Sequence, residues 1–119
     1  MSRTLRLLAV LAIVTACHGS SSSPTAPPPP AATTIDILGE HASSSFAPNP
    51  GTAKMGTTIE WKNSDVNTHH IVSNTSGVFD TGNIGGGTTS QAVTVDKPGS
   101  YPYHCTIHPT MTGTLNVSE

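Results

Sequence analysis

The sequence predicts an all-β protein, a small antiparallel β-sandwich, and three observations support this fold class. In "TTIEWKN" (residues 57–63) the apolar Ile59 and Trp61 alternate with the polar Glu60 and Lys62. A period of two places neighbouring side chains on opposite faces of a strand. Similar short runs are bounded by glycine, proline, asparagine and serine, and no window has the i, i+3, i+4, i+7 spacing of an amphipathic helix. Short strands joined by tight turns are typical of a sandwich.

The first 16 residues have the pattern of an export signal. Arg3 and Arg6 precede an apolar run from Leu7 to Val14 that is too short to span a bilayer, and small residues follow it. The stretch "VTAC" resembles the lipobox of bacterial lipoproteins, which implies a lipidated Cys17 as the mature N-terminus and an anchor in a membrane. Ordinary cleavage after Ala16 is the alternative. Both alternatives predict an exported protein of the periplasm or cell envelope.

Residues 17–34 are expected to form a spacer between the lipidated Cys17 and a folded domain. The stretch "HGSSSSPTAPPPPAATT" contains almost only serine, proline, alanine and threonine. Such segments are disordered or polyproline-like, and 17 residues at about 3.1 Å each reach roughly 50 Å when extended. The sequence therefore predicts a signal peptide at 1–16, the lipidated cysteine and linker at 17–34, and one domain at 35–119.

The charge balance argues against nucleic acid as a partner. Removal of residues 1–16 leaves three lysines, no arginine and seven acidic residues, a net charge of −4 with histidine neutral. Proteins that bind nucleic acid present clustered basic residues to the phosphates. We therefore expect no nucleic-acid binding.

Six runs of the domain are expected to be strands, in this order: 34–38, 57–63, 69–73, 90–96, 100–105 and 112–118. The segments 49–56, 76–87 and 96–99 separate them and are expected to be loops or turns. The glycine-rich "GNIGGGTT" (82–89) has neither the Lys-Ser/Thr pair nor the following helix of a phosphate-binding loop. We interpret it as a turn.

The segment "YPYHCTIHPTM" (101–111) concentrates metal-binding side chains near the end of the chain. Strand alternation places Tyr101, Tyr103 and Cys105 on one face, and two tyrosines on that face indicate that it points into the core. The spacing Cys-x-x-His-x-x-Met then supplies Cys105, His108 and Met111 from one tight loop. Three of the donors of a metal site are therefore expected from this loop.

The donor types indicate copper. Zinc sites use four strong ligands, commonly with paired cysteines, and iron–sulfur clusters need about four thiolates, whereas this domain has one cysteine. The Cys-x-x-Cys-His motif of c-type haem attachment is absent. One thiolate, two imidazoles and a weak thioether are the ligands of a blue-copper site, which is trigonal with a long axial methionine.

The second imidazole has to come from elsewhere in the chain. In "NTHHIVS" (67–73), His69 and His70 lie on opposite faces of a strand, so at most one of them can point toward Cys105. His41 and His104 are the other candidates, and the residue pattern alone leaves this choice open.

The motifs of residues 35–119 together resemble the cupredoxins, particularly the plastocyanin and amicyanin branch. The early part, "WKNSDVNTHHIVS", is similar to the family's Trp-x-Asn, turn and His pattern, and "FAPNPGTAKMGTTIEW" matches the preceding strand and glycine turn. The late part, "FDTGNIGGGTTSQAVTVDKPGSYPYHCTIHPTMTGTLNV", is similar to the family's run through the Cys-x-x-His-x-x-Met loop to the last strand. The resemblance implies a Greek-key β-sandwich with one copper ion.

The resemblance also implies the roles of individual residues. The copper ligands are expected to be His69, Cys105, His108 and Met111, with His70 and Thr106 supporting them. Family members usually have Asn or Thr after the first histidine, where a hydrogen bond ties the two ligand loops together. His70 replaces that residue here, and Ile107 replaces a proline common before the second histidine.

The function expected from this site is outer-sphere electron transfer by a copper that cycles between Cu(I) and Cu(II). Transient docking to a redox donor and a redox acceptor follows from that role. Four protein ligands leave no open position for a substrate, so the chain is not expected to be an enzyme. Two alternatives are a protein that holds or delivers copper at the cell envelope, and a metal-free sandwich used for adhesion or structure.

Overall fold

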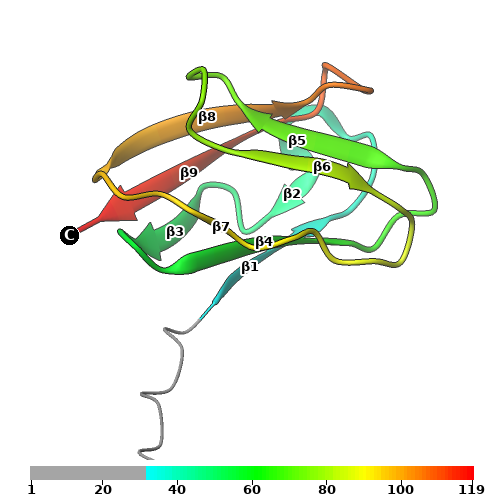
Figure 1. Ribbon diagram of the computed structural model, residues 1–119. Coiled ribbons are helices and arrows are strands. Elements are labelled where there is room, and N and C mark those ends of the chain that lie inside the picture. The colour runs from blue at the N-terminus through cyan, green and yellow to red at the C-terminus, as the bar shows by residue number, and fades with distance from the viewer. Residues whose placement is uncertain (1–31) are drawn as a thin grey trace, which may run out of the picture.

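The computed structural model describes residues 32–119, which form two β-sheets packed face to face (Figure 1). The predicted signal peptide, Cys17 and nearly all of the predicted linker lie outside the described residues. The elements are β1 (Thr33–Ile37), the 3-10 turn η1 (Ala42–Ser44), β2 (Phe46–Ala47), β3 (Gly51–Lys54), β4 (Thr58–Asn63), β5 (His69–Ser73), β6 (Asp80–Ile84), β7 (Val93–Thr94), β8 (Gly99–Cys105) and β9 (Thr112–Ser118). Because β1 begins at Thr33, the fold starts two residues before the predicted domain boundary. Within residues 32–119, no helix has the length and apolar character needed to cross a membrane.

The strand order confirms the predicted sandwich and corrects the direction of two strand pairs. One sheet has the order β2-β1-β4-β7, and the other has the order β3-β9-β8-β5-β6. The pairs β1–β4 and β3–β9 are parallel, so the expectation of an antiparallel sandwich was wrong for these two pairs. Alternation in the sequence determines which face of a strand is buried, but it carries no information on the direction of the neighbouring strand. Strands brought together by crossovers between the sheets can therefore pair in parallel.

Two strands formed where the sequence indicated loops or turns. Strand β3 alternates buried Gly51 and Ala53 with exposed Thr52 and Lys54, and its buried residues are too small to give an apolar signal. Strand β6, with the sequence "DTGNI", lies within the segment 76–87. A bulge between His70 and Val72 shifts its pairing with β5. The turn prediction for 82–89 was therefore wrong for Gly82–Ile84 and holds for the residues that follow.

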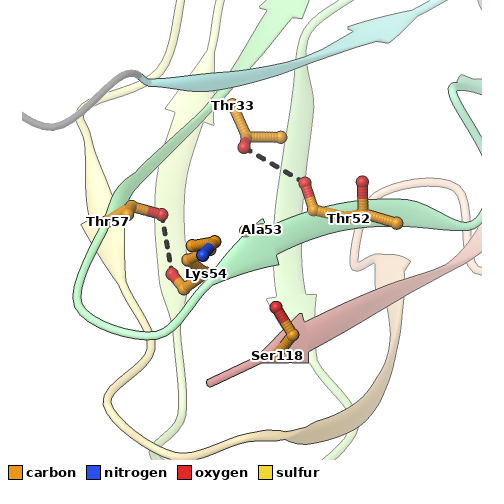
Figure 2. Close-up of a pocket in the computed structure, with 6 residues that line it drawn as sticks. All are labelled: Thr33, Thr52, Ala53, Lys54, Thr57 and Ser118. Atoms are coloured by element: carbon orange, nitrogen blue, oxygen red, sulfur yellow. Dashed lines mark hydrogen bonds between the residues drawn. The ribbon is translucent and has the colours of Figure 1, made fainter.

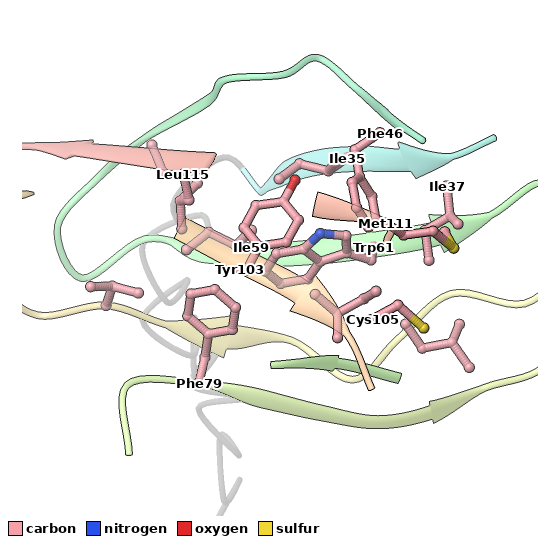
Figure 3. Close-up of a cluster of buried hydrophobic side chains, with 14 of the residues drawn as sticks. Ile35, Ile37, Phe46, Ile59, Trp61, Phe79, Tyr103, Cys105, Met111 and Leu115 are labelled. Atoms are coloured by element: carbon pink, nitrogen blue, oxygen red, sulfur yellow. The ribbon is translucent and has the colours of Figure 1, made fainter. Parts of the chain in front are cut away.

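The core lies between the sheets and is centred on Trp61 (Figure 3). Ile59 and Trp61 are fully buried, as the alternation in β4 predicted. The ring of Tyr103 stands edge-on to Trp61 with centroids 5.5 Å apart, and Phe79 packs against both rings, 5.2 Å from Trp61 and 6.1 Å from Tyr103. Such edge-to-face pairs add to the free energy gained by burying the rings. The aromatic cluster thus joins β4 of one sheet to β8 of the other.

Two polar atoms of this cluster have no hydrogen-bond partner among the described residues: the indole Nε1 of Trp61 and the hydroxyl of Tyr103. Burial raises the pKa of Tyr103 to about 12. A buried phenolate would lose its hydration, so the protonated form is favoured. Tyr103 is therefore a neutral core residue at physiological pH.

The sandwich has two ends, which are defined by where its strands begin and end. The β8–β9 loop (106–111) lies at one end, and the C-terminus and the start of β1 lie at the other (Figure 1). Because β1 and β4 are parallel, both run toward the end that carries the β8–β9 loop. The residues after β1 and after β4 consequently lie at the end of the sandwich that carries His108, where Glu40 contacts His108 and Asp65 contacts His69.

Candidate metal centre

Cys105 is the last residue of β8, a central strand of the five-stranded sheet. Its side chain is fully buried, which agrees with the inward face predicted for Tyr103 and Cys105. The backbone N–H of Cys105 donates to the carbonyl of Met111 at 3.1 Å, and the N–H of Met111 donates to the carbonyl of His108 at 2.9 Å. These two hydrogen bonds close the loop, so its side chains are held relative to the end of β8.

His69 is the first residue of β5, the strand next to β8. Its side chain is fully buried, and its Nδ1 lies 3.7 Å from Cys105 Sγ. His70 points to the other side of the sheet, where its Nε2 contacts the Asp80 carboxylate. The structure therefore settles the choice that the alternating pattern left open, in favour of His69.

The ligand atoms of His69, Cys105 and His108 converge on one point. The Nδ1 of His108 lies 3.9 Å from Cys105 Sγ and 3.2 Å from the Nδ1 of His69. A first-row metal bound at about 2.0–2.1 Å to nitrogen and about 2.3 Å to sulfur, in a trigonal plane, separates its donors by roughly 3.5–3.8 Å. The spacing of 3.2–3.9 Å among the three donor atoms brackets that range, so the cluster fits one metal ion.

Carboxylates contact the outer nitrogens of both imidazoles. Asp65 Oδ2 lies 2.9 Å from His69 Nε2, and Glu40 Oε1 lies 3.2 Å from His108 Nε2. The hydrogen bond from His69 and the N–H of Val66 hold the pKa of the Asp65 carboxyl below its usual value. An ionised carboxylate can only accept, so an imidazole that donates to it through Nε2 is free, in its neutral form, to offer a lone pair on Nδ1 to a metal. Two such lone pairs 3.2 Å apart repel each other unless a cation lies between them.

Met111 is buried at the end of the β8–β9 loop, immediately before β9. Figure 3 shows the sulfur atoms of Met111 and Cys105 at the same end of the core, beyond Trp61. A buried thioether there supplies the weak fourth donor that the sequence predicted.

The remaining histidines of the described residues lie outside the cluster. His41 is exposed in the β1–β2 loop, and His104 hydrogen-bonds Asn74 through Nδ1 on the outer face of β8. The group of residues that can hold a metal ion in the described part of the chain consists of His69, Cys105 and His108.

The link between the two ligand loops differs from the one that the resemblance implied. The side chain of His70 bonds to Asp80 of β6 and not to the other loop. Instead, the N–H of Thr106 donates to the carbonyl of His70 at 2.8 Å, and the N–H of His70 points to Cys105 Sγ at 3.4 Å. The main chain of His70 and Thr106 thus links the two ligand loops, and the His70 imidazole does not.

Sequence reasoning missed Asp65 and Glu40. Both lie in loops, where no periodicity shows which way a side chain points, and Glu40 is 68 positions from His108 in the chain. A carboxylate four residues before a candidate ligand is a weak signal that could have suggested Asp65. Nothing in the sequence pattern indicates Glu40.

A separate pocket lies at the opposite end of the sandwich (Figure 2). It is lined by Thr33, Thr52, Ala53, Lys54, Thr57 and Ser118. Two of its hydroxyl groups are already used, because Thr33 donates to the Thr52 carbonyl and Thr57 donates to the Lys54 carbonyl. None of the four candidate ligands lines this pocket, so it is not a substrate cavity for the metal site.

The fold and the donor set define a copper protein with a mononuclear type 1 site. The chain belongs to the cupredoxin-like domain family, whose model matches residues 6–117. Its cofactor is one copper ion per domain, at the site formed by His69, Cys105, His108 and Met111.

Solved structures with the same fold include a novel purple cupredoxin from Nitrosopumilus maritimus. That structure has a TM-score of 0.64 and 24% identity over 72% of this chain and 99% of the other. A reduced Cu(I) form of an amicyanin variant has a TM-score of 0.59 and 25% identity over 73% of this chain and 82% of the other. No curated protein sequence matches the chain at a significant level.

A copper-containing nitrite reductase from Thermus scotoductus SA-01 is also similar. It has a TM-score of 0.62 and 33% identity over 80% of this chain. The match covers 23% of the reductase, so the chain corresponds to about a quarter of that enzyme.

Separate substitutions of His69 and His70 test which of these two neighbouring histidines binds copper. We expect His69→Ala to lose the intense visible absorption of the copper-loaded protein and to weaken copper binding by more than ~100-fold, because loss of a mere supporting partner already costs about 10–100-fold. His70→Asn is expected to keep the colour, since the His70 imidazole points to Asp80. Visible spectra and copper titrations of the two variants make the comparison, and the reverse pattern would assign the ligand to His70.

Substitution of the axial donor is expected to change the potential and spare the fold. Met111→Leu conserves volume in the core and should keep copper bound. Loss of the thioether removes electron density that favours Cu(II), so the reduction potential should rise by on the order of 60 mV, a tenfold change in the one-electron equilibrium. Met55→Leu is the matched control, because Met55 is exposed in the β3–β4 turn. Equal potentials for the two variants would exclude Met111 as a ligand.

Proposed function

We propose that the protein is a one-electron carrier. The observation that supports this function is the convergence of a buried cysteine sulfur and two imidazoles on one point in the sandwich. Copper supplies the redox chemistry when bound, by accepting and releasing one electron. The residues contribute a fixed donor set: His69 and Cys105 are held by adjacent strands, and hydrogen bonds close the loop that carries His108. Donors that cannot rearrange keep the change in geometry between the two oxidation states small.

We propose that the electron enters and leaves the site through the imidazole of His108. Its side chain is 21% exposed, whereas His69 and Cys105 are fully buried. Ile107 beside it is 47% exposed and gives this edge an apolar surface. A redox partner that docks here approaches the site through one imidazole. A small interface is sufficient for such a transient contact.

The carrier function is favoured over catalysis and over copper delivery. Protein side chains supply all four donors, and the pocket of Figure 2 lies at the other end of the sandwich. The similarity to a nitrite reductase covers about a quarter of that enzyme, so it supports a shared domain and not a shared reaction. Release of copper to another protein would require access to Cys105 and His69, which are both fully buried.

The location proposed for this carrier is the cell envelope, with Cys17 lipidated. The arrangement of the fold is compatible with an N-terminal tether, because β1 begins at the end of the sandwich opposite to His108 (Figure 1). Incorporation of labelled fatty acid into the chain expressed in a bacterium tests the anchor. Label that persists in Cys17→Ser would contradict it.

Potentiometric titration of the purified, copper-loaded chain tests the electron-transfer function. We expect one reversible one-electron transition and fast reduction by small outer-sphere reagents. Retention of copper through repeated cycles is part of the expected result. Loss of copper on reduction, or a transition that does not reverse, would contradict electron transfer and favour a copper-holding protein.

A further inference from the structure

The exposed edge of His108 is covered by a charged group from a distant part of the chain. Glu40 lies in the β1–β2 loop (38–45), and its Oε1 lies 3.2 Å from His108 Nε2. Its side chain is 49% exposed, whereas the side chain of Asp65, which contacts His69, is 16% exposed. Of the two carboxylates that contact the imidazoles, Glu40 is thus the one that a docking molecule can reach.

The β1–β2 loop holds Glu40 at this position. The N–H of Leu38 donates to the carbonyl of Ser45 at 2.8 Å, and the N–H of His41 donates to the hydroxyl of the fully buried Ser45 at 2.8 Å. Gly39 is buried with a φ of +119°, and a Cβ at this position would lie 3.6 Å from Asp65 Cγ. Glu40 is therefore flanked on both sides by residues with fixed backbone contacts, and its contact with His108 is built into the fold.

The charge of Glu40 is not balanced by a lysine. Its side-chain contact in the described part of the chain is His108, and Lys54, Lys62 and Lys97 form no salt bridge there. Two exposed apolar side chains are neighbours of this contact in the sequence. Leu38, which is 48% exposed, is two residues before Glu40, and Ile107, which is 47% exposed, is next to His108. The surface proposed for electron exchange thus combines apolar side chains with a carboxylate that no lysine neutralises.

We propose that Glu40 is a positioning and selectivity residue of this site, which holds the His108 ring through Nε2–H and directs docking toward partners that present a cationic group. This inference rests on the proposed electron-transfer function. A negative charge beside the ligand also stabilises the more positive, oxidised state of the site and lowers its reduction potential. In the exchange that follows docking, the site loses one electron and the oxidant gains it, and no bond is formed or broken. The partner class is therefore a redox protein with lysine or arginine at its docking face.

The test compares the full-length, copper-loaded wild type with Glu40→Gln. The variant keeps an acceptor oxygen and removes the charge. Glu60→Gln is the matched control, because Glu60 lies on β4, away from the imidazoles. The probes are two small oxidants, the cationic tris(phenanthroline)cobalt(III) and the anionic hexacyanoferrate(III), used at low and high ionic strength.

For Glu40→Gln we expect the ratio of the rate with the cationic oxidant to the rate with the anionic oxidant to fall by roughly two- to ten-fold, at the lower end of electrostatic steering. The difference should shrink at high salt, because screening shortens the range of the charge to about 8 Å at 0.15 M. The reduction potential should rise in Glu40→Gln and stay unchanged in Glu60→Gln. A rate ratio and a potential equal to those of Glu60→Gln would overturn the proposal.

A readout without copper separates this proposal from the proposed function. In the copper-free wild type, nitrogen NMR should report His108 protonated on Nε2, and Glu40→Ala should lose that preference. If the wild type exchanges electrons and the Glu40→Gln variant behaves identically, the role of Glu40 is overturned and the proposed function stands. A wild type that fails to exchange electrons with either oxidant overturns the proposed function and the partner class together, whatever the tautomer of His108.

Discussion

Cys105→Ser is expected to abolish the intense visible absorption of the copper-loaded protein completely. The colour of a type 1 site arises from the thiolate bond to copper, and Cys105 is the cysteine that lies within 3.9 Å of both imidazole Nδ1 atoms. A serine hydroxyl is a poor substitute, because it is not ionised at neutral pH and is a harder donor. Visible spectra recorded after addition of one equivalent of Cu(II) measure the effect.

Cys17→Ser is the matched control for this experiment, since Cys17 is the only other cysteine in the chain. It should retain the full absorption at equal protein concentration. A Cys105→Ser variant that stays blue would show that the site is assigned to the wrong residues. Circular dichroism of both variants checks that the sandwich has formed.

Gly113→Ala is expected to destabilise the fold by about 2–4 kcal/mol, because the position has no room for a methyl group. Gly113 on β9 pairs with Tyr103 on β8, and the ring of Tyr103 lies across it. A Cβ at position 113 would approach Tyr103 Cζ to 2.4 Å. Neither the ring nor the central strands can move away, since Tyr103 is packed against Trp61 and Phe46. Urea unfolding followed by tryptophan fluorescence measures the loss of stability.

Two further variants isolate the steric cause. Gly85→Ala is the control, because a Cβ there would meet its nearest neighbour at 3.8 Å, and it should change stability by less than about 1 kcal/mol. The double variant Gly113→Ala with Tyr103→Leu should lose less stability than the sum of the two single losses, since the ring that causes the clash is absent. Strict additivity would show that the cost at position 113 has another origin.

Much of the fold could be predicted because the relevant signals are local. Alternation in β4 predicted the buried Ile59 and Trp61, and alternation in β8 predicted the inward Cys105. Strand β3 was missed because its buried positions are filled by the small residues Gly51 and Ala53, and β6 was missed because Ile84 is its only large apolar residue, which gives no alternating pattern. The parallel pairs β1–β4 and β3–β9 depend on crossovers between sheets, which a linear pattern does not encode.

The candidate site also contains residues that the sequence could reveal and residues that it could not. Cys105, His108 and Met111 could be found because one short loop carries all three. The choice of His69 over His70 required either the family resemblance or the structure, since alternation states only that one of them faces inward. Glu40 and Asp65 depend on how two loops fold against each other, and this information is absent from periodicity. The lipidation of Cys17 lies outside the described residues and stays a prediction.

The most direct test of the copper site is a visible spectrum of the purified chain with one equivalent of Cu(II), recorded before reduction, after ascorbate and after reoxidation. We predict an intense band that bleaches with ascorbate and returns in full on oxidation, as a thiolate–copper site that carries one electron requires. A pale or colourless complex, or a band that does not return, would contradict a type 1 copper site at His69, Cys105, His108 and Met111.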